Sequence, residues 1–63
     1  MNSKWYVVFR SLDQNGVLSR FGVQCNSKKQ AQGFKFKIKE KFEVENIRIC
    51  CHPLMTNLTM IEL

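Results

Sequence analysis

The most reactive side chains lie near the end of the chain, in the sequence Cys50-Cys51-His52-Pro53. Two residues apart in a strand, Cys50 and His52 share a face, as a nucleophile and its base would. A catalytic dyad usually needs a third group to orient the histidine, and no motif here supplies one. We therefore expect no catalytic residues and no enzymatic activity.

Metal binding is the second chemistry that these residues suggest, since Cys25 completes a set of three cysteines and one histidine. Structural zinc sites usually use cysteine pairs separated by about two to four residues, and the sequence has none. The adjacent thiols of Cys50 and Cys51 would point to opposite faces of a strand. We expect small buried hydrophobic side chains here, with no metal site and no cofactor.

Positive charge is the clearest functional signal. Ten lysines and arginines against five acidic residues give a formal net charge of +5 in 7.4 kDa, which favours anionic partners, above all DNA or RNA. Such a charge is also ordinary for a small domain.

The longest apolar run, Trp5 to Phe9, is far shorter than the roughly 20 residues of a membrane span. With no secretory leader pattern, we expect a cytoplasmic protein without a membrane partner.

A β-hairpin is predicted over about residues 4–25, because Asn15-Gly16 separates two β-rich runs. A two-residue loop would mix apolar and polar partners on both faces. A three-residue loop over residues 14–16 places three apolar pairs together on one face, so we favour that register. Its pairs are Phe9 with Phe21, Val7 with Val23, and Trp5 with Cys25.

The favoured register places Arg10 directly across from Arg20 on the other face of the hairpin. Like charges so placed cost a few tenths of a kcal/mol up to about 1 kcal/mol. A bound anion would offset this repulsion; alternatively both side chains extend into water, or one reaches Asp13 or an acidic residue of the tail. Tyr6 and Gln24 share the face and suit stacking on a base and hydrogen bonding to adenine.

Residues 33–42, GFKFKIKEKF, have both a strand and a helix interpretation. Their aromatic and lysine residues alternate as in a half-buried strand, but that arrangement places Glu40 on the apolar face. Ser27, or else Asn26, is suited to cap a helix over about 27–42. The helix also gives one apolar stripe, and we favour it although it contains Gly33 and leaves Phe36 exposed. The stripe consists of Ala31, Phe34, Ile38 and Phe42.

In the helical interpretation, lysines border this apolar stripe on both sides as two basic rims. In the strand interpretation, those from Lys35 onwards would instead form one continuous ladder. Either arrangement can contact phosphates, which supply most of the affinity in non-specific nucleic-acid binding. The lysines are Lys28, Lys29, Lys35, Lys37, Lys39 and Lys41.

A further strand is predicted over about residues 44–51, with Ile47 and Ile49 on one face and Arg48 and Cys50 on the other. Residues 56–63 form a last strand or a tail whose inner face the pattern does not choose. The inner set is either Leu58 and Met60 or Thr59, Ile61 and Leu63. The chain is thus expected to be one small α+β domain over residues 1–63. Its small antiparallel sheet, ββαβ or ββαββ, carries one helix on one face.

About two-thirds of the chain, residues 4–42, resembles the arm-type DNA-binding domain of phage-type tyrosine recombinases. The shared pattern is an aromatic-led strand from Trp5, a turn at Gly16, a second strand, and Ser27-Lys28-Lys29-x-Ala31 entering a helix. The sheet of that family enters the major groove, which implies Arg10, Arg20 and Gln24 as contacts. The family usually has three strands before its helix and further domains after it.

These observations lead to two functional hypotheses. The first is a small basic, non-enzymatic nucleic-acid-binding domain of phage or mobile-element origin, in which helix lysines hold phosphates while Arg10, Arg20 and Tyr6 read or stack. The second is a protein-interaction or inhibitor module that acts through an apolar tail, an open sheet edge or homodimerisation. Its partner would be an acidic protein or a second copy of the chain.

Overall fold

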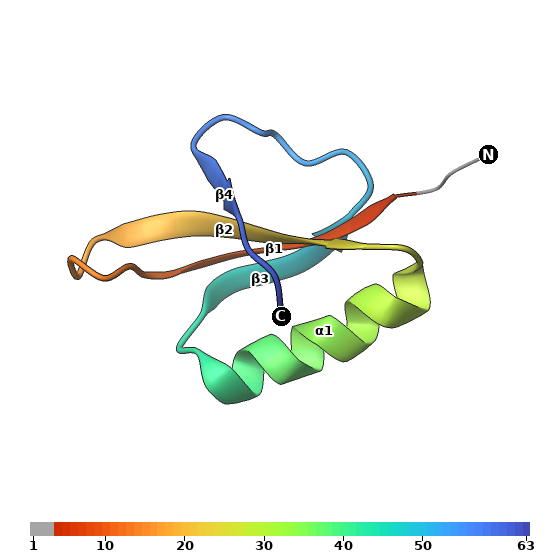
Figure 1. The fold of residues 1–63 in the computed structure, drawn as a ribbon, viewed down its shortest axis with the longest axis horizontal. Coiled ribbons are helices and arrows are strands. Elements are labelled where there is room, and N and C mark those ends of the chain that lie inside the picture. The colour runs from red at the N-terminus through yellow and green to blue at the C-terminus, as the bar shows by residue number, and fades with distance from the viewer. Residues whose placement is uncertain (1–3) are drawn as a thin grey trace.

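The computed structural model describes residues 4–63, so the first three residues of the expected domain lie outside it. The elements are β1 (Trp5–Leu12), β2 (Leu18–Cys25), α1 (Lys28–Lys41), β3 (Glu45–Cys50) and β4 (Leu58–Met60). They form one sheet in the order β3-β1-β2-β4. The helix α1 covers one face of this sheet, and the segment joining β3 to β4 crosses the other (Figure 1). The predicted α+β fold, with one helix on a small sheet, is confirmed.

The hairpin has the register of a three-residue loop. Phe9 lies opposite Phe21, and Arg10 lies opposite Arg20, as predicted. The loop closes through two backbone hydrogen bonds: Asp13 N–H donates to Val17 O at 2.9 Å, and Gly16 N–H donates to Asp13 O at 3.0 Å. Gly16 has φ +76, a left-handed conformation that costs glycine nothing.

The side chain of Asp13 holds the turn together. Its Oδ1 accepts hydrogen bonds from the N–H groups of Asn15 at 2.8 Å and Val17 at 3.0 Å. Its Oδ2 accepts one from Ser19 Oγ at 3.1 Å. These bonds favour the carboxylate, with the Val17 bond the strongest influence, and they lower the pKa of Asp13 below its usual value.

The helix interpretation of residues 33–42 is correct. Ser27 Oγ accepts the Gln30 N–H at 3.1 Å, and Gln30 Oε1 in turn accepts the Asn26 N–H at 2.7 Å. This exchange satisfies donors that a helix start leaves without partners. The helix ends where Phe42 turns to an extended conformation, its N–H still donating to Ile38 O. Phe36 is 68 % exposed, as expected for a residue outside the stripe.

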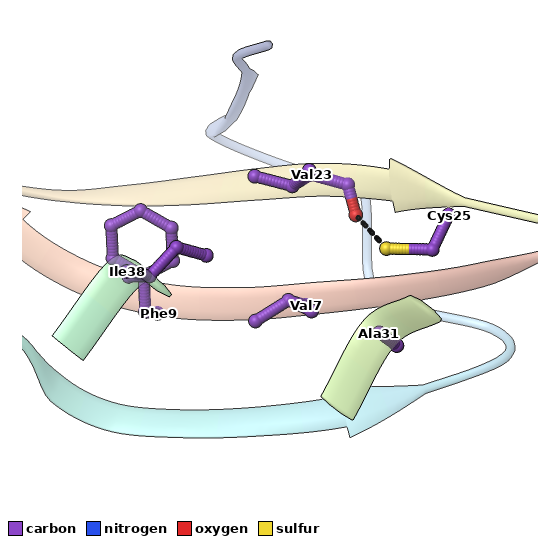
Figure 2. Packing of buried hydrophobic residues seen from close by; sticks show 6 residues of the cluster. All are labelled: Val7, Phe9, Val23, Cys25, Ala31 and Ile38. Carbon is purple, nitrogen blue, oxygen red and sulfur yellow. Dashed lines mark hydrogen bonds between the residues drawn. The ribbon is translucent and has the colours of Figure 1, made fainter. Parts of the chain in front are cut away.

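The core lies between the sheet and α1 (Figure 2). Strands β1 and β2 supply the alternate residues Val7, Phe9, Val23 and Cys25, while α1 supplies Ala31 and Ile38. Phe9 is the largest fully buried side chain of the core. The centre of its ring lies 5.7 Å from that of Phe21 and 6.1 Å from that of Phe42, and both pairs are stacked. Phe42 thus completes the predicted apolar stripe from a position just beyond the helix.

Strand β3 pairs antiparallel with β1 through a bulge. Two residues, Asn46 and Ile47, occupy the space between the pairs Val8–Arg48 and Arg10–Glu45, where β1 has only Phe9. Asn46 takes the left-handed conformation at φ 53, which asparagine tolerates better than most residues. Ile47 within the bulge and Ile49 beyond it both pack against the core, which confirms that they share a face.

The last strand, β4, differs from the expected antiparallel arrangement because it runs parallel to β2. Ile61 N–H donates to Gly22 O at 2.9 Å, and the Ile61 side chain packs against the core. Leu58 and Met60 lie on the opposite face, above Gly22. A Cβ on Gly22 would stand 3.2 Å from Met60 Sδ and 3.3 Å from the Leu58 methyl groups. The missing side chain of Gly22 therefore lets these two residues approach the sheet.

Asp13 in the hairpin turn should make the free energy of unfolding depend on pH in the acidic range. Because the folded-state pKa of Asp13 is below 3.8, its contribution is complete above that pH and is lost as the pH falls through the lowered pKa. We expect the stability difference between wild type and Asp13→Asn to shrink between about pH 6 and about pH 2 in urea titrations. Gln14→Ala, in the same turn, should keep the acid sensitivity of wild type. A difference for Asp13→Asn that stays constant with pH would contradict this role.

Candidate nucleic-acid interface

The sheet face opposite α1, called here the arginine face, carries Arg10, Arg20 and Arg48. Arg10 and Arg20 are direct cross-strand partners on β1 and β2. Arg48 enters from β3, where it lies across from Val8, the residue two positions before Arg10. Neighbouring strands are about 4.8 Å apart, so the three guanidinium groups extend from one small area of sheet.

Residues 51–57, called here the strap, cross this face between β3 and β4. Arg20 fixes the strap, because its Nη1 donates to Leu54 O at 2.7 Å and to Thr56 O at 3.0 Å. The strap closes on itself where Leu58 N–H donates to Met55 O at 3.2 Å. The partners of Arg20 are thus backbone carbonyls of the strap, and not Asp13 or an acidic residue of the tail. Val8 is only 4 % exposed although it points away from the helix.

Between the strap and the sheet lies a hollow of about 540 Å³. Its lining combines the three arginines with His52 and Cys50, and the described residues that line it include no carboxylate. Glu45 is the cross-strand partner of Arg10 on β3 but does not line the hollow. A cationic hollow with an apolar floor at Val8 is suited to a small anion or to one charged end of a larger one.

Tyr6 and Gln24 lie on the arginine face as predicted, but at its other end. They are cross-strand partners, and Tyr6 also lies across from Cys50. Tyr6 and Arg10 are four positions apart along β1, which is about 13 Å at the rise of a strand. Gln24 is exposed and Tyr6 is half-buried. Neither residue lines the hollow that the arginines surround.

The six lysines of α1 lie on the other layer, with the sheet between them and the arginine face (Figure 1). Lys28 Nζ stands 5.8 Å from the centre of the Trp5 ring, and Lys37 Nζ stands 5.9 Å from that of Phe34. Lys35 is half-buried, and the others are exposed. The structure therefore divides the predicted binding residues into two sets on opposite layers of the molecule.

The cysteines do not form a metal centre with the acidic and histidine residues. Within residues 4–63, no three side chains of His, Cys, Asp or Glu gather as a metal ion would require. Cys25 is buried, and burial raises the pKa of its thiol, which keeps it protonated and unreactive. Over the same residues, no helix is both long and apolar enough to cross a membrane.

Sequence reasoning did not include Arg48 and His52 in the predicted site. The alternation of residues 47–50 does place Arg48 on the face away from the core. What the pattern lacks is the strand order, because nothing local says that β3 pairs with β1 beside Arg10. The strap was likewise outside the prediction, since it is held by Arg20, more than thirty residues earlier in the chain.

Removing the guanidinium group of Arg20 should loosen the strap. We expect Arg20→Gln to lower the free energy of unfolding by about 1 kcal/mol, because two hydrogen bonds from a charged donor are lost. Amide exchange at Leu58 and Ile61 should become faster. Arg10→Gln is the matched control: it removes the opposing like charge, so stability should stay the same or rise slightly. Equal effects of the two substitutions in urea unfolding would show that Arg20 does not anchor the strap.

Comparison with known proteins adds no relative: no family model, curated protein or solved structure gives a significant match to this chain. The resemblance to arm-type domains of tyrosine recombinases therefore stays a prediction. The strap does bear on it, since residues 54–56 stand above Arg20 on the face that would enter the major groove.

Proposed function

We propose that this chain is a small, non-enzymatic nucleic-acid-binding domain that contacts its ligand through the arginine face. The observation that carries the proposal is the gathering of Arg10, Arg20 and Arg48 around one hollow. Repulsion between the opposed guanidinium groups lowers the stability of the fold. A phosphate bound between them would relieve this repulsion, and the relief adds to its binding free energy. Phosphate also matches the planar fork of donors that each guanidinium presents.

A single strand suits this surface better than a duplex. The strap stands above the middle of the sheet, where a rigid double helix would have to approach. A flexible strand can place one phosphate at the arginines and pass beside the strap towards Tyr6 and Gln24, where a base can stack or hydrogen-bond. The lysines of α1 then act from the other layer by raising the positive potential that attracts the strand.

Two double variants test which layer binds. Arg10→Gln/Arg48→Gln and Lys29→Gln/Lys39→Gln each remove two positive charges. By fluorescence anisotropy near 0.15 M salt, we expect the arginine pair to weaken binding of a single-stranded oligonucleotide by about tenfold or more and the lysine pair by about threefold or less.

A salt series on single-stranded DNA, duplex DNA and RNA completes this test. Wild-type affinity should fall steeply with salt, and the slope of log K against log salt should be smaller for the arginine variant. The proposal would be wrong if wild type bound nothing at low salt, if binding ignored salt, or if both double variants weakened it equally.

A second candidate function, binding of a protein, has its own supporting observation. Exposed apolar side chains border the arginine face: Leu12 and Leu18 at the end of the hairpin, and Leu54 and Met55 on the strap. Leu12 is 62 % exposed and Leu54 is 71 % exposed, as is common at interaction surfaces. β3 is also an edge strand, to which another chain can add. An acidic protein or a second copy would be the partner.

Light scattering after gel filtration separates the two candidates. If the apolar border binds a second copy, wild type should have the mass of two chains and Leu12→Ser/Leu18→Ser should have the mass of one. Binding of the same samples to an oligonucleotide is measured in parallel. A stable dimer that ignores nucleic acid would favour the protein-binding function, whereas a monomer that binds the oligonucleotide would exclude the dimer.

A further inference from the structure

The hollow beneath the strap is bounded in a way that limits what can enter it. The sheet forms its floor at Val8, and the strap forms its roof at Pro53 and Leu54. The strap is continuous with β3 at Cys50 and with β4 at Leu58, so the chain itself closes two sides. A group that enters must therefore do so from one of the remaining sides.

The charges around the hollow exceed what one phosphodiester needs. An internal phosphodiester has one negative charge and two free oxygens. A phosphomonoester carries about −1.5 to −2 near neutral pH and offers three strong acceptor oxygens. Arg10 and Arg48 are exposed and line the hollow, and each can donate two parallel hydrogen bonds to such a group. Arg20 uses Nη1 for the strap, and a guanidinium has further N–H donors available.

The remaining lining suits the nucleoside attached to such a phosphate. Val8, Pro53 and Leu54 give apolar surface, while Thr56 and Asn57 offer a hydroxyl and an amide. A volume of about 540 Å³ lies within the range of about 300 to 1,000 Å³ typical of small-ligand sites. The hollow therefore matches one nucleotide in both size and chemistry.

We infer that the hollow binds the terminal phosphomonoester of a nucleic-acid strand together with its end nucleotide. This inference rests on the proposed function and specifies its ligand: a phosphorylated strand end, not an internal stretch. Arg10 and Arg48 bind the phosphate. Arg20 is a positioning residue, because its hydrogen bonds to Leu54 O and Thr56 O set the height of the strap above the sheet.

The test compares oligonucleotides of one sequence that carry a 5′-phosphate, a 3′-phosphate or hydroxyl groups at both ends. We expect wild type to bind one phosphorylated form about tenfold more tightly than the hydroxyl form. Arg48→Gln should reduce this ratio to about one, and Arg48→Lys, which keeps the charge but not the fork, should give an intermediate ratio. Lys39→Gln, on the other layer, should preserve the ratio. Circular dichroism and urea unfolding verify that each variant is folded.

The outcomes separate this inference from the proposed function. Salt-dependent binding with a ratio of about one in wild type would overturn the strand-end site and leave nucleic-acid binding intact. A phosphate preference that Arg48→Gln retains would place the site elsewhere and also overturn it. Inorganic phosphate and a nucleoside monophosphate serve as competitors. If they bind in an Arg48-dependent way and no oligonucleotide binds, the hollow is a small-molecule site and both proposals are wrong.

Discussion

The pairing register of β1 with β2 is the constraint on which the rest of this structure depends. Side chains alternate along a strand, so one choice of register assigns every residue of the hairpin to a face. The Asp13–Gly16 turn makes that choice. It places Val7 and Phe9 under the helix and, by the same step, places Arg10 against Arg20. The core and the arginine face are therefore two consequences of one turn, and a slip of one residue would lose both.

The features that the sequence predicted are those that local interactions determine. The hairpin register follows from a turn and its flanking apolar pairs, and the start of α1 follows from Ser27 and Gln30. In residues 33–42 the local alternation misleads, because a helix cap and a helical stripe outweigh it. Phe36 fits the alternating strand pattern but lies outside the helical stripe, and it is exposed in the structure.

The features that escaped prediction depend on contacts between distant parts of the chain. The position of β3 beside β1 brings Arg48 to the face of Arg10, although about forty residues of chain separate them. The tail pattern does not choose an inner face because each of its faces contributes a packed residue: Ile61 packs towards the core, and Leu58 packs over Gly22. The parallel strand β4 follows the strap, whose carbonyls accept hydrogen bonds from the distant Arg20.

The strap makes it possible for one face of the sheet to be both packed and charged. A sheet with a single helix normally leaves its other face to water, and there Val8 would be exposed. Seven residues without regular structure cannot bury much apolar surface, so hydrogen bonds must hold them in place. Arg20 supplies these bonds through a cation that water can still reach at the edge of the hollow. The positively charged side chain of Arg20 thus both holds the strap and can attract an anion.

Distance then separates the two basic surfaces. The helix, the sheet and the strap stack along the intermediate axis of the molecule, which is 25 Å long (Figure 1), whereas charges in about 0.15 M salt are screened over about 8 Å. The lysines of α1 therefore neither offset nor increase the repulsion among the arginines at close range. That repulsion has to be relieved on its own face. Strap carbonyls do so for Arg20, and Glu45 lies across from Arg10. Arg48 lies across from apolar Val8, so no cross-strand partner relieves its charge in this way.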